Sequence, residues 1–181
     1  SKLEPLINYG HCHFGENKVQ EAEKKWSQIV KINKNLKIHM VGKLQSNKAK
    51  KAINIFNFIH SLDNYKLADV CKKSEDEFNK KISYFIQVNI GNETQKSGVL
   101  MKDAKSFLKY CSVENKLNVI GLMVLPPNDN NTEKYFEDVS ELNSELGLKD
   151  LSMGMSADYR IALKYKSTYL RIGSAILGKR T

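Results

Sequence analysis

Apolar residues along this chain recur in a regular order, in which short apolar runs alternate with longer amphipathic stretches. Short apolar runs bounded by polar or small residues are typical of buried strands. We expect strands at residues 11–15, 37–42, 58–62, 83–90, 117–123, 151–155 and 169–172.

The stretches between these runs show the spacing of helices. In residues 19–32, for example, Val19, Ala22, Trp26, Ile29 and Val30 fall on one face. We expect further helices at residues 45–55, 65–79, 104–111, 133–146 and 157–165. Residues 3–9 are interpreted as what is left of a helix that precedes the first strand.

Strict alternation of strands and helices predicts parallel strands joined by helical crossovers, hence an α/β fold. A doubly wound sheet and a (β/α)8 TIM barrel both fit, and the near-uniform repeat favours the barrel. Seven expected strands leave such a barrel with its first strand missing, and we expect that strand upstream of Ser1. Residues 1–181 are therefore predicted to form a single barrel domain that is incomplete at the N-terminus.

Composition narrows the possible partners and the compartment. No run of about 18 apolar residues occurs, which excludes a membrane-spanning helix. The net charge of +9 comes mostly from lysines spread over amphipathic stretches, so we expect a solvated surface and no specific nucleic-acid face. Cys12, Cys71 and Cys111 are far apart and form no CxxC pair, which favours the cytoplasm over an oxidising compartment.

The candidate chemistry lies near the C-terminus. Leu-Ser-Met-Gly-Met-Ser at 151–156 and Arg-Ile-Gly-Ser at 171–174 each end a strand with small residues and a hydroxyl. Two such strand ends, with exposed backbone N–H groups, predict a cradle for a phosphate dianion, and Arg171 adds a planar cation. The ligand site is thus expected at the carboxyl ends of the strands.

Other polar residues at strand ends leave alternatives open. His11 and His13 are either a metal pair or partly packed strand residues, and His39 and His60 are either ligand contacts or buried structural histidines. Glu16 is a candidate general base or a charge complementing a helix dipole, and Asn17 is an N-cap or a ligand donor. The Lys-Ser-Gly at 96–98 is an anion-binding turn or an ordinary loop.

Six ordered blocks resemble a known family. They are FGENKVQE at 14–21, IHMVGKLQSNK at 38–48, QVN with KSG at 87–89 and 96–98, GLM with PP at 121–123 and 126–127, LSMGMS at 151–156, and RIGS at 171–174. Together they resemble the YggS/PROSC family, the pyridoxal phosphate homeostasis proteins, from about Leu3 to the C-terminus.

This resemblance implies a pyridoxal 5'-phosphate (PLP) barrel of fold type III, similar to the N-terminal domain of alanine racemase. It implies that Ser156, Gly173 and Ser174 hold the phosphate and that Arg171 approaches the pyridine nitrogen, which makes the ring a weaker electron sink. By the same resemblance the remaining cofactor-binding residues lie around the pocket; they are Asn17, His39 and Met155. Lys48 and Lys96 match lysines near the pocket without a defined role.

The Schiff-base lysine is where the chain departs from the family, because Lys2 is closer to Phe14 than the family lysine is to its FGEN block. Either that lysine lies upstream of Ser1, or Lys2 is that lysine and residues are missing after it.

The function implied is that of a monomeric carrier or buffer of intracellular PLP, without catalytic turnover and with apo-enzymes as recipients. A PLP enzyme of the alanine racemase or decarboxylase type is the alternative. An RNA-binding domain is a third class, and the lysines lack the interleaved aromatic residues that it would need.

Overall fold

The structure is a computed structural model that describes residues 3–91, 93 and 95–178. Seven parallel strands form one sheet in the order β1-β2-β3-β4-β5-β6-β7. The strands are β1 His13–Glu16, β2 Lys37–Met40, β3 Phe58–Leu62, β4 Ser83–Val88, β5 Asn118–Val124, β6 Asp150–Met155 and β7 Tyr169–Arg171. The predicted parallel α/β barrel with seven strands is confirmed.

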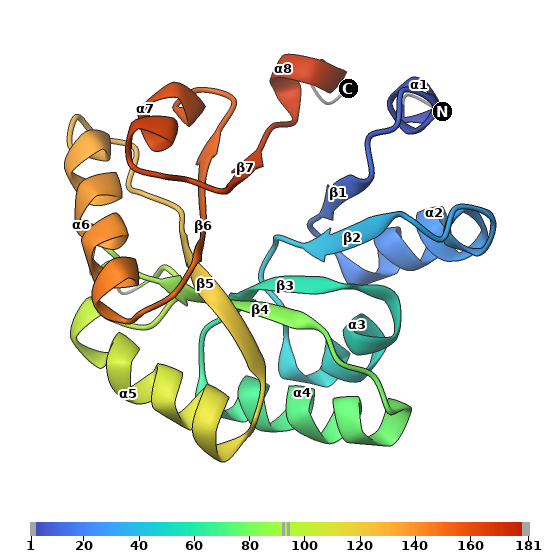
Figure 1. The fold of residues 1–181 in the computed structure, drawn as a ribbon, viewed down its shortest axis with the longest axis horizontal. Coiled ribbons are helices and arrows are strands. Elements are labelled where there is room, and N and C mark those ends of the chain that lie inside the picture. The colour runs from blue at the N-terminus through green and yellow to red at the C-terminus, as the bar shows by residue number, and fades with distance from the viewer. Residues whose placement is uncertain (1–2, 92, 94, 179–181) are drawn as a thin grey trace.

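Eight α-helices occur in the described residues, and Figure 1 shows most of them on the outside of the curved sheet. They are α1 Glu4–Asn8, α2 Val19–Ile32, α3 Ala49–Ile55, α4 Tyr65–Phe78, α5 Ala104–Lys109, α6 Thr132–Glu145, α7 Tyr159–Lys164 and α8 Ser174–Leu177. Two 3-10 turns precede α3 and α5, and α5 runs into a π-helical turn at Tyr110–Glu114. The predicted helices are present, whereas α8 has no counterpart among the sequence predictions.

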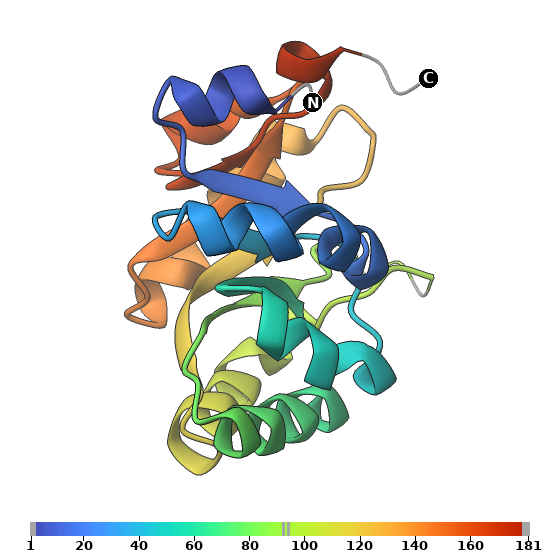
Figure 2. The same cartoon turned by 90° about the vertical axis from the view of Figure 1, so that its right-hand side faces the viewer.

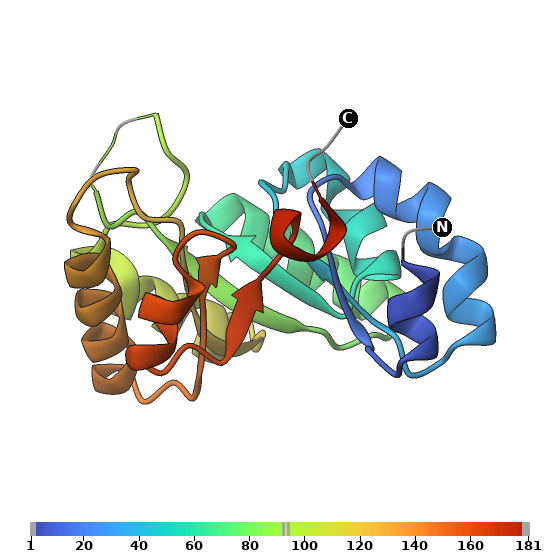
Figure 3. The same ribbon diagram turned by 90° about the horizontal axis from the view of Figure 1, so that it is seen from above.

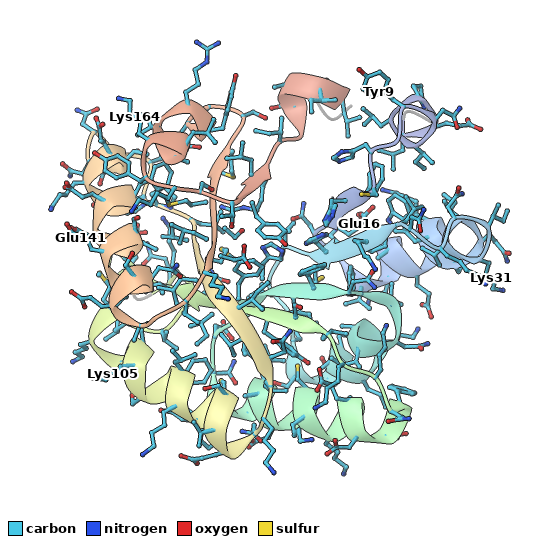
Figure 4. The ribbon with its side chains drawn as sticks, in the orientation of Figure 1. Tyr9, Glu16, Lys31, Lys105, Glu141 and Lys164 are labelled. Atoms are coloured by element: carbon cyan, nitrogen blue, oxygen red, sulfur yellow. The ribbon has the colours of Figure 1, made fainter. Side chains whose placement is uncertain are left out.

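The main core lies between the sheet and these helices. On α2, Val19, Ala22 and Trp26 are buried as the helical spacing predicted, while Ile29 and Val30 are only partly buried. Charged residues such as Lys31, Lys105 and Glu141 lie around the outside (Figure 4). The lysine-rich composition is therefore accommodated on the solvated faces of the helices.

The sheet is curved so that its two edges approach each other. In the described part of the chain β1 pairs only with β2 and β7 only with β6. The ring of Tyr169 on β7 nevertheless lies 6.3 Å from that of His13 on β1, measured between centroids. Helices α1 and α8 lie at the same end of the molecule in two perpendicular views (Figures 1 and 2), and Figure 3 shows the structure from above.

Gly154 on β6 is a position where the fold requires glycine. Its φ of +92° is rarely adopted by L-residues, and a Cβ there would lie 2.7 Å from the Cβ of Ala162 on α7. This close approach fixes the path of the chain just before Met155 and Ser156. Gly147, after α6, has a comparable φ of +67° but nothing within 4 Å of the added Cβ.

We predict that Gly154→Ala lowers the free energy of unfolding more than Gly147→Ala does. Gly147→Ala carries only the left-handed strain, about 1–2 kcal/mol, whereas Gly154→Ala adds overpacking of roughly 1–3 kcal/mol. Urea denaturation of the two variants and the parent measures the difference. Equal losses in both variants would show that the contact with Ala162 imposes no constraint.

Candidate phosphate cradle and barrel interior

Ser156 is the centre of the predicted phosphate cradle. Its Oγ accepts long hydrogen bonds from the backbone N–H groups of Gly173 and Ala175, both 3.3 Å between heavy atoms. Ser156 is half-buried, whereas Gly173, Ser174 and Ala175 are exposed. The structure therefore brings together the hydroxyl and backbone donors of the two C-terminal motifs at one accessible point.

The turn between β6 and α7 orders this region. Asp158 accepts a hydrogen bond from the backbone N–H of Met155, 2.6 Å from N to Oδ1. The side chain of Met155 is 42% exposed, so it is available at the surface beside the cradle and takes no part in the core. Ser174 is the first residue of α8.

Arg171 lies on β7 two residues before Gly173, and its guanidinium joins three strands. Nη1 donates to Oγ of Ser152 on β6 at 2.7 Å, and Nη2 donates to the carbonyl oxygen of Val124 on β5 at 2.8 Å. Burial lowers the pKa of Arg171 to about 10, and the negative charge of Asp158 opposes that shift. The group stays cationic at neutral pH, and within the described residues no carboxylate forms an ion pair with it.

Three histidines extend this network through the barrel interior. Nδ1 of His60 lies 2.8 Å from Oγ of Ser152, Nδ1 of His39 lies 2.9 Å from Nε2 of His60, and Nδ1 of His13 lies 2.9 Å from Nε2 of His39. His39 and His60 are buried, and His13 is exposed. His39 and His60 are thus buried and hydrogen-bonded to each other, and contact of His39 with a ligand stays a prediction.

Aromatic rings enclose the histidine chain. His39 stacks on Phe58 with 4.2 Å between centroids, and His60 stacks on Phe85 at 4.3 Å. The ring of Tyr169 packs against the same group, 5.8 Å from His39 and 5.9 Å from His60. The polar chain therefore runs through an otherwise apolar interior, where an unpaired polar group would be costly.

Burial keeps the histidines neutral. Desolvation, helped by the charge of His13, lowers the pKa of His39 to about 3. Desolvation also lowers the pKa of His60 well below its usual range, with further contributions from His39 and Arg171. Partial desolvation, together with the charges of His11 and Lys37, lowers the pKa of the exposed His13 as well.

Glu16, the last residue of β1, makes side-chain contacts that the sequence did not indicate. Glu16 is buried, and its Oε1 accepts from Nε1 of Trp26 and from Nζ of Lys25, each at 2.7 Å. Figure 4 places Glu16 nearer the middle of the molecule than the labelled Lys31, Lys105 and Glu141. Glu16 thus anchors α2 to β1, and neither the general-base nor the simple dipole interpretation describes its contacts.

The expected N-cap at Asn17 is wrong, because α2 begins at Val19 with Lys18 as its N-cap. Asn17 is exposed at the carboxyl end of β1, and its backbone abuts Gly42, where a Cβ would lie 2.3 Å from the carbonyl oxygen. His11 precedes β1 and packs edge-on against Phe14. No group of metal-ligating side chains occurs within the described residues.

The QVN and KSG blocks hold a loop against the end of β4. Gln87 donates to the carbonyl oxygen of Ser97, and Asn89 bonds the backbone of Glu93 at both its amide nitrogen and its amide oxygen. Lys96 forms an ion pair with Glu93. These contacts pin a polar loop to the end of β4, and Lys48 lies in the 3-10 turn before α3.

Sequence reasoning missed Ser152, Phe58, Phe85 and Tyr169, which complete the interior of the barrel. Alternation along each strand was the available signal, since positions two apart share a face. Phe58 and His60 on β3 are such a pair.

Comparison with known proteins places the chain among close relatives. The family model described as the alanine racemase N-terminal domain matches residues 2–181. A pyridoxal phosphate homeostasis protein of Aquifex aeolicus is 36% identical over 187 residues, which cover 98% of this chain and 81% of that protein. A protein of the same name in Pasteurella multocida is 33% identical, with 94% and 78% covered.

Solved structures agree with these matches. PipY from Synechococcus elongatus, solved without PLP, is 32% identical with a TM-score of 0.91 and covers 98% of this chain and 86% of its own. The same protein solved with PLP bound gives a TM-score of 0.88 at 32% identity, with 97% and 86% covered. Alanine racemase from Clostridium difficile, at 12% identity and a TM-score of 0.68, shares the fold over 99% of this chain and 48% of its own.

We predict that the protein loses stability as the pH falls from 7 to 5. The pKa of His39 is about 3 in the folded state and about 6.5 when unfolded, so the unfolded chain binds more protons in this interval. The contribution of His39 to the free energy of unfolding is fully present above its unfolded-state pKa and is lost as the pH falls towards its folded-state pKa. By pH 5 this loss is about 2 kcal/mol for His39 alone. His60 acts in the same direction.

Urea denaturation at pH 7, 6 and 5 measures this loss. His39→Gln, although less stable overall, should show a shallower dependence on pH because it removes one of the titrating groups. A free energy of unfolding that stays constant across the interval would contradict the burial of neutral histidines.

Proposed function

This chain belongs to the alanine racemase N-terminal domain family and, within it, to the pyridoxal phosphate homeostasis proteins, and from this membership we propose that it binds PLP and carries or buffers it. The observation that supports the proposal most is the convergence of Ser156 with the backbone N–H groups of Gly173 and Ala175, next in the chain to β7 and its Arg171. The exposed Ser174 and Met155 flank this point and are proposed as further contacts.

The phosphate of PLP suits the cradle for a physical reason. Backbone N–H groups and hydroxyls are the donors with which loops bind phosphate dianions, and these ones are accessible. In the structure the two backbone donors share a single hydroxyl oxygen at 3.3 Å, which is longer than the usual length. A charged phosphate oxygen would make shorter and stronger bonds to the same donors.

The pyridine nitrogen of PLP is assigned to Arg171. Two of the five guanidinium N–H groups donate to Ser152 and Val124, and the cation has no carboxylate partner within the described residues. A permanent cation beside the ring nitrogen disfavours its protonation, so PLP would supply a weaker electron sink than in enzymes that protonate it. Asn17 and His39 are retained as proposed pocket residues, Asn17 exposed at a strand end and His39 in the interior chain.

The absence of catalytic turnover is part of the proposal. It is supported by the names of the relatives and by the cation at Arg171, which works against carbanion chemistry. The recipients we propose are PLP-dependent apo-enzymes in the cytoplasm. Free thiols at Cys12, Cys71 and Cys111 are consistent with that reducing compartment, and within the described residues no helix is long and apolar enough to cross a membrane.

We expect titration with PLP to produce saturable binding, measured by visible absorbance, that Ser156→Ala weakens. Loss of one hydrogen bond to a charged group corresponds to about 10- to 100-fold in the dissociation constant. Ser144→Ala is the matched control, because that exposed hydroxyl on α6 bonds only its own helix at Ser140 among the described residues. Equal affinity in the two variants, or no saturable binding, would contradict the assignment of the cradle.

Borohydride reduction followed by peptide mass mapping decides how PLP is anchored. Lys2, the candidate Schiff-base lysine, lies outside the described residues. An adduct on Lys2 would identify it as the anchor, whereas saturable binding without an adduct would mean that this chain holds PLP non-covalently.

We also expect no exchange of the α-proton of amino acids into D2O in the presence of PLP and this protein beyond the rate with PLP alone. Proton NMR of alanine and lysine follows the exchange. Exchange that the protein accelerates and Arg171→Lys alters would favour the racemase or decarboxylase alternative.

A further inference from the structure

An unbroken hydrogen-bonded chain connects Arg171 to the exposed residue His13. It passes from Arg171 on β7 to Ser152 on β6, then to His60 on β3, His39 on β2 and His13 on β1. The four links measure 2.7, 2.8, 2.9 and 2.9 Å between heavy atoms. The chain therefore crosses the barrel between strands far apart in the sequence.

Arginine sets the direction of this chain because a guanidinium only donates hydrogen bonds. Oγ of Ser152 accepts from Arg171, which leaves the hydroxyl proton to be donated to Nδ1 of His60. A neutral His60 that accepts at Nδ1 carries its proton on Nε2 and donates to Nδ1 of His39. By the same logic His39 carries its proton on Nε2 and donates to Nδ1 of His13.

The opposite direction is unfavourable for two reasons. If Nδ1 of His60 carried the proton, Oγ of Ser152 would accept twice, and its own proton would lack an acceptor among the described residues in a site where Ser152 is fully buried. That imidazole N–H would also point towards the positive end of the chain at Arg171. Both effects favour one tautomer, protonated at Nε2, for all three histidines.

We propose that Ser152 and His60, supported by His39 and His13, are positioning residues that fix the guanidinium of Arg171 through a hydrogen-bonded chain of single direction. The second anchor, the carbonyl oxygen of Val124, holds Nη2, so the two contacts together orient the planar group. An effect of this positioning on PLP binding rests on the function proposed above, in which the remaining N–H groups of Arg171 approach the pyridine nitrogen.

Nitrogen NMR of the ligand-free protein tests the direction without any variant and without PLP. The chain contains four histidines and three arginines, so labelling either residue type gives a spectrum with few signals. At pH 7.5 we expect His39 and His60 to show Nε2–H and unprotonated Nδ1. Protonation at Nδ1 in either residue, or a mixture of tautomers, would overturn the proposal.

Two substitutions at His60 separate a positioning role from packing. Gln retains an acceptor for Ser152 and a donor for His39, whereas Phe retains only the ring that stacks on Phe85. We expect His60→Phe to speed exchange of the Arg171 side-chain N–H protons with water by about 10-fold or more, and His60→Gln to restore slow exchange. Equal exchange in both variants would overturn the proposal.

Ser152→Ala extends the test to the ligand, with Ser61→Ala as its matched control. Ser61 is also a buried serine, but its Oγ has no hydrogen-bond partner among the described residues. We expect Ser152→Ala to release Arg171 in the exchange measurement and to weaken PLP binding about 10- to 100-fold, and Ser61→Ala to do neither. Fast Arg171 exchange only in Ser152→Ala supports the proposal, whether or not PLP binds. Absence of PLP binding in the parent and in both variants would contradict the proposed function and leave the positioning proposal standing. Unchanged exchange in Ser152→Ala would overturn it.

Discussion

The guanidinium of Arg171 is a cation inside a barrel whose interior is otherwise lined by aromatic rings. A desolvated charge is tolerated only when neighbouring groups satisfy it, and here the neighbours are a serine hydroxyl and a backbone carbonyl rather than a carboxylate. This choice leaves the positive charge unneutralised by any ion pair within the described residues. The three strands that carry Arg171, Ser152 and Val124 must keep their register for the site to exist.

The same requirement explains why three histidines line the interior. Ser152 has one proton to donate once it accepts from Arg171. A buried neutral imidazole accepts that proton's hydrogen bond at one ring nitrogen and donates from the other nitrogen to the next residue. His13 ends this sequence at an exposed position, where water can satisfy its outer nitrogen. Stacking of His39 on Phe58 and of His60 on Phe85 fixes the ring planes, so that polar pairing and apolar packing act on the same side chains.

Much of the fold follows from the sequence because its signals are local. Alternating apolar runs and helical spacing predicted all seven strands and their parallel order. Local rules failed where tertiary contacts decide. Asn17 is a strong N-cap residue by type, but Lys18 is the N-cap and α2 starts at Val19, on which the neighbouring Glu16 bonds Trp26 and Lys25. Helix α8 is too short for a periodic pattern, and Gly173 and Ala175 at its start both bond Ser156.

The candidate site likewise has a part that local sequence signals predicted and a part that only tertiary contacts determine. The meeting of its outer residues, Ser156, Gly173 and Ser174, was predictable because two motifs at strand ends must lie at one edge of a parallel sheet. Its inner part was not, because the link between His60 and Ser152 joins residues 92 positions apart. No short-range pattern encodes that pairing. A motif can therefore specify which groups come together at a strand end, while the direction in which their protons point depends on partners found only in the folded barrel.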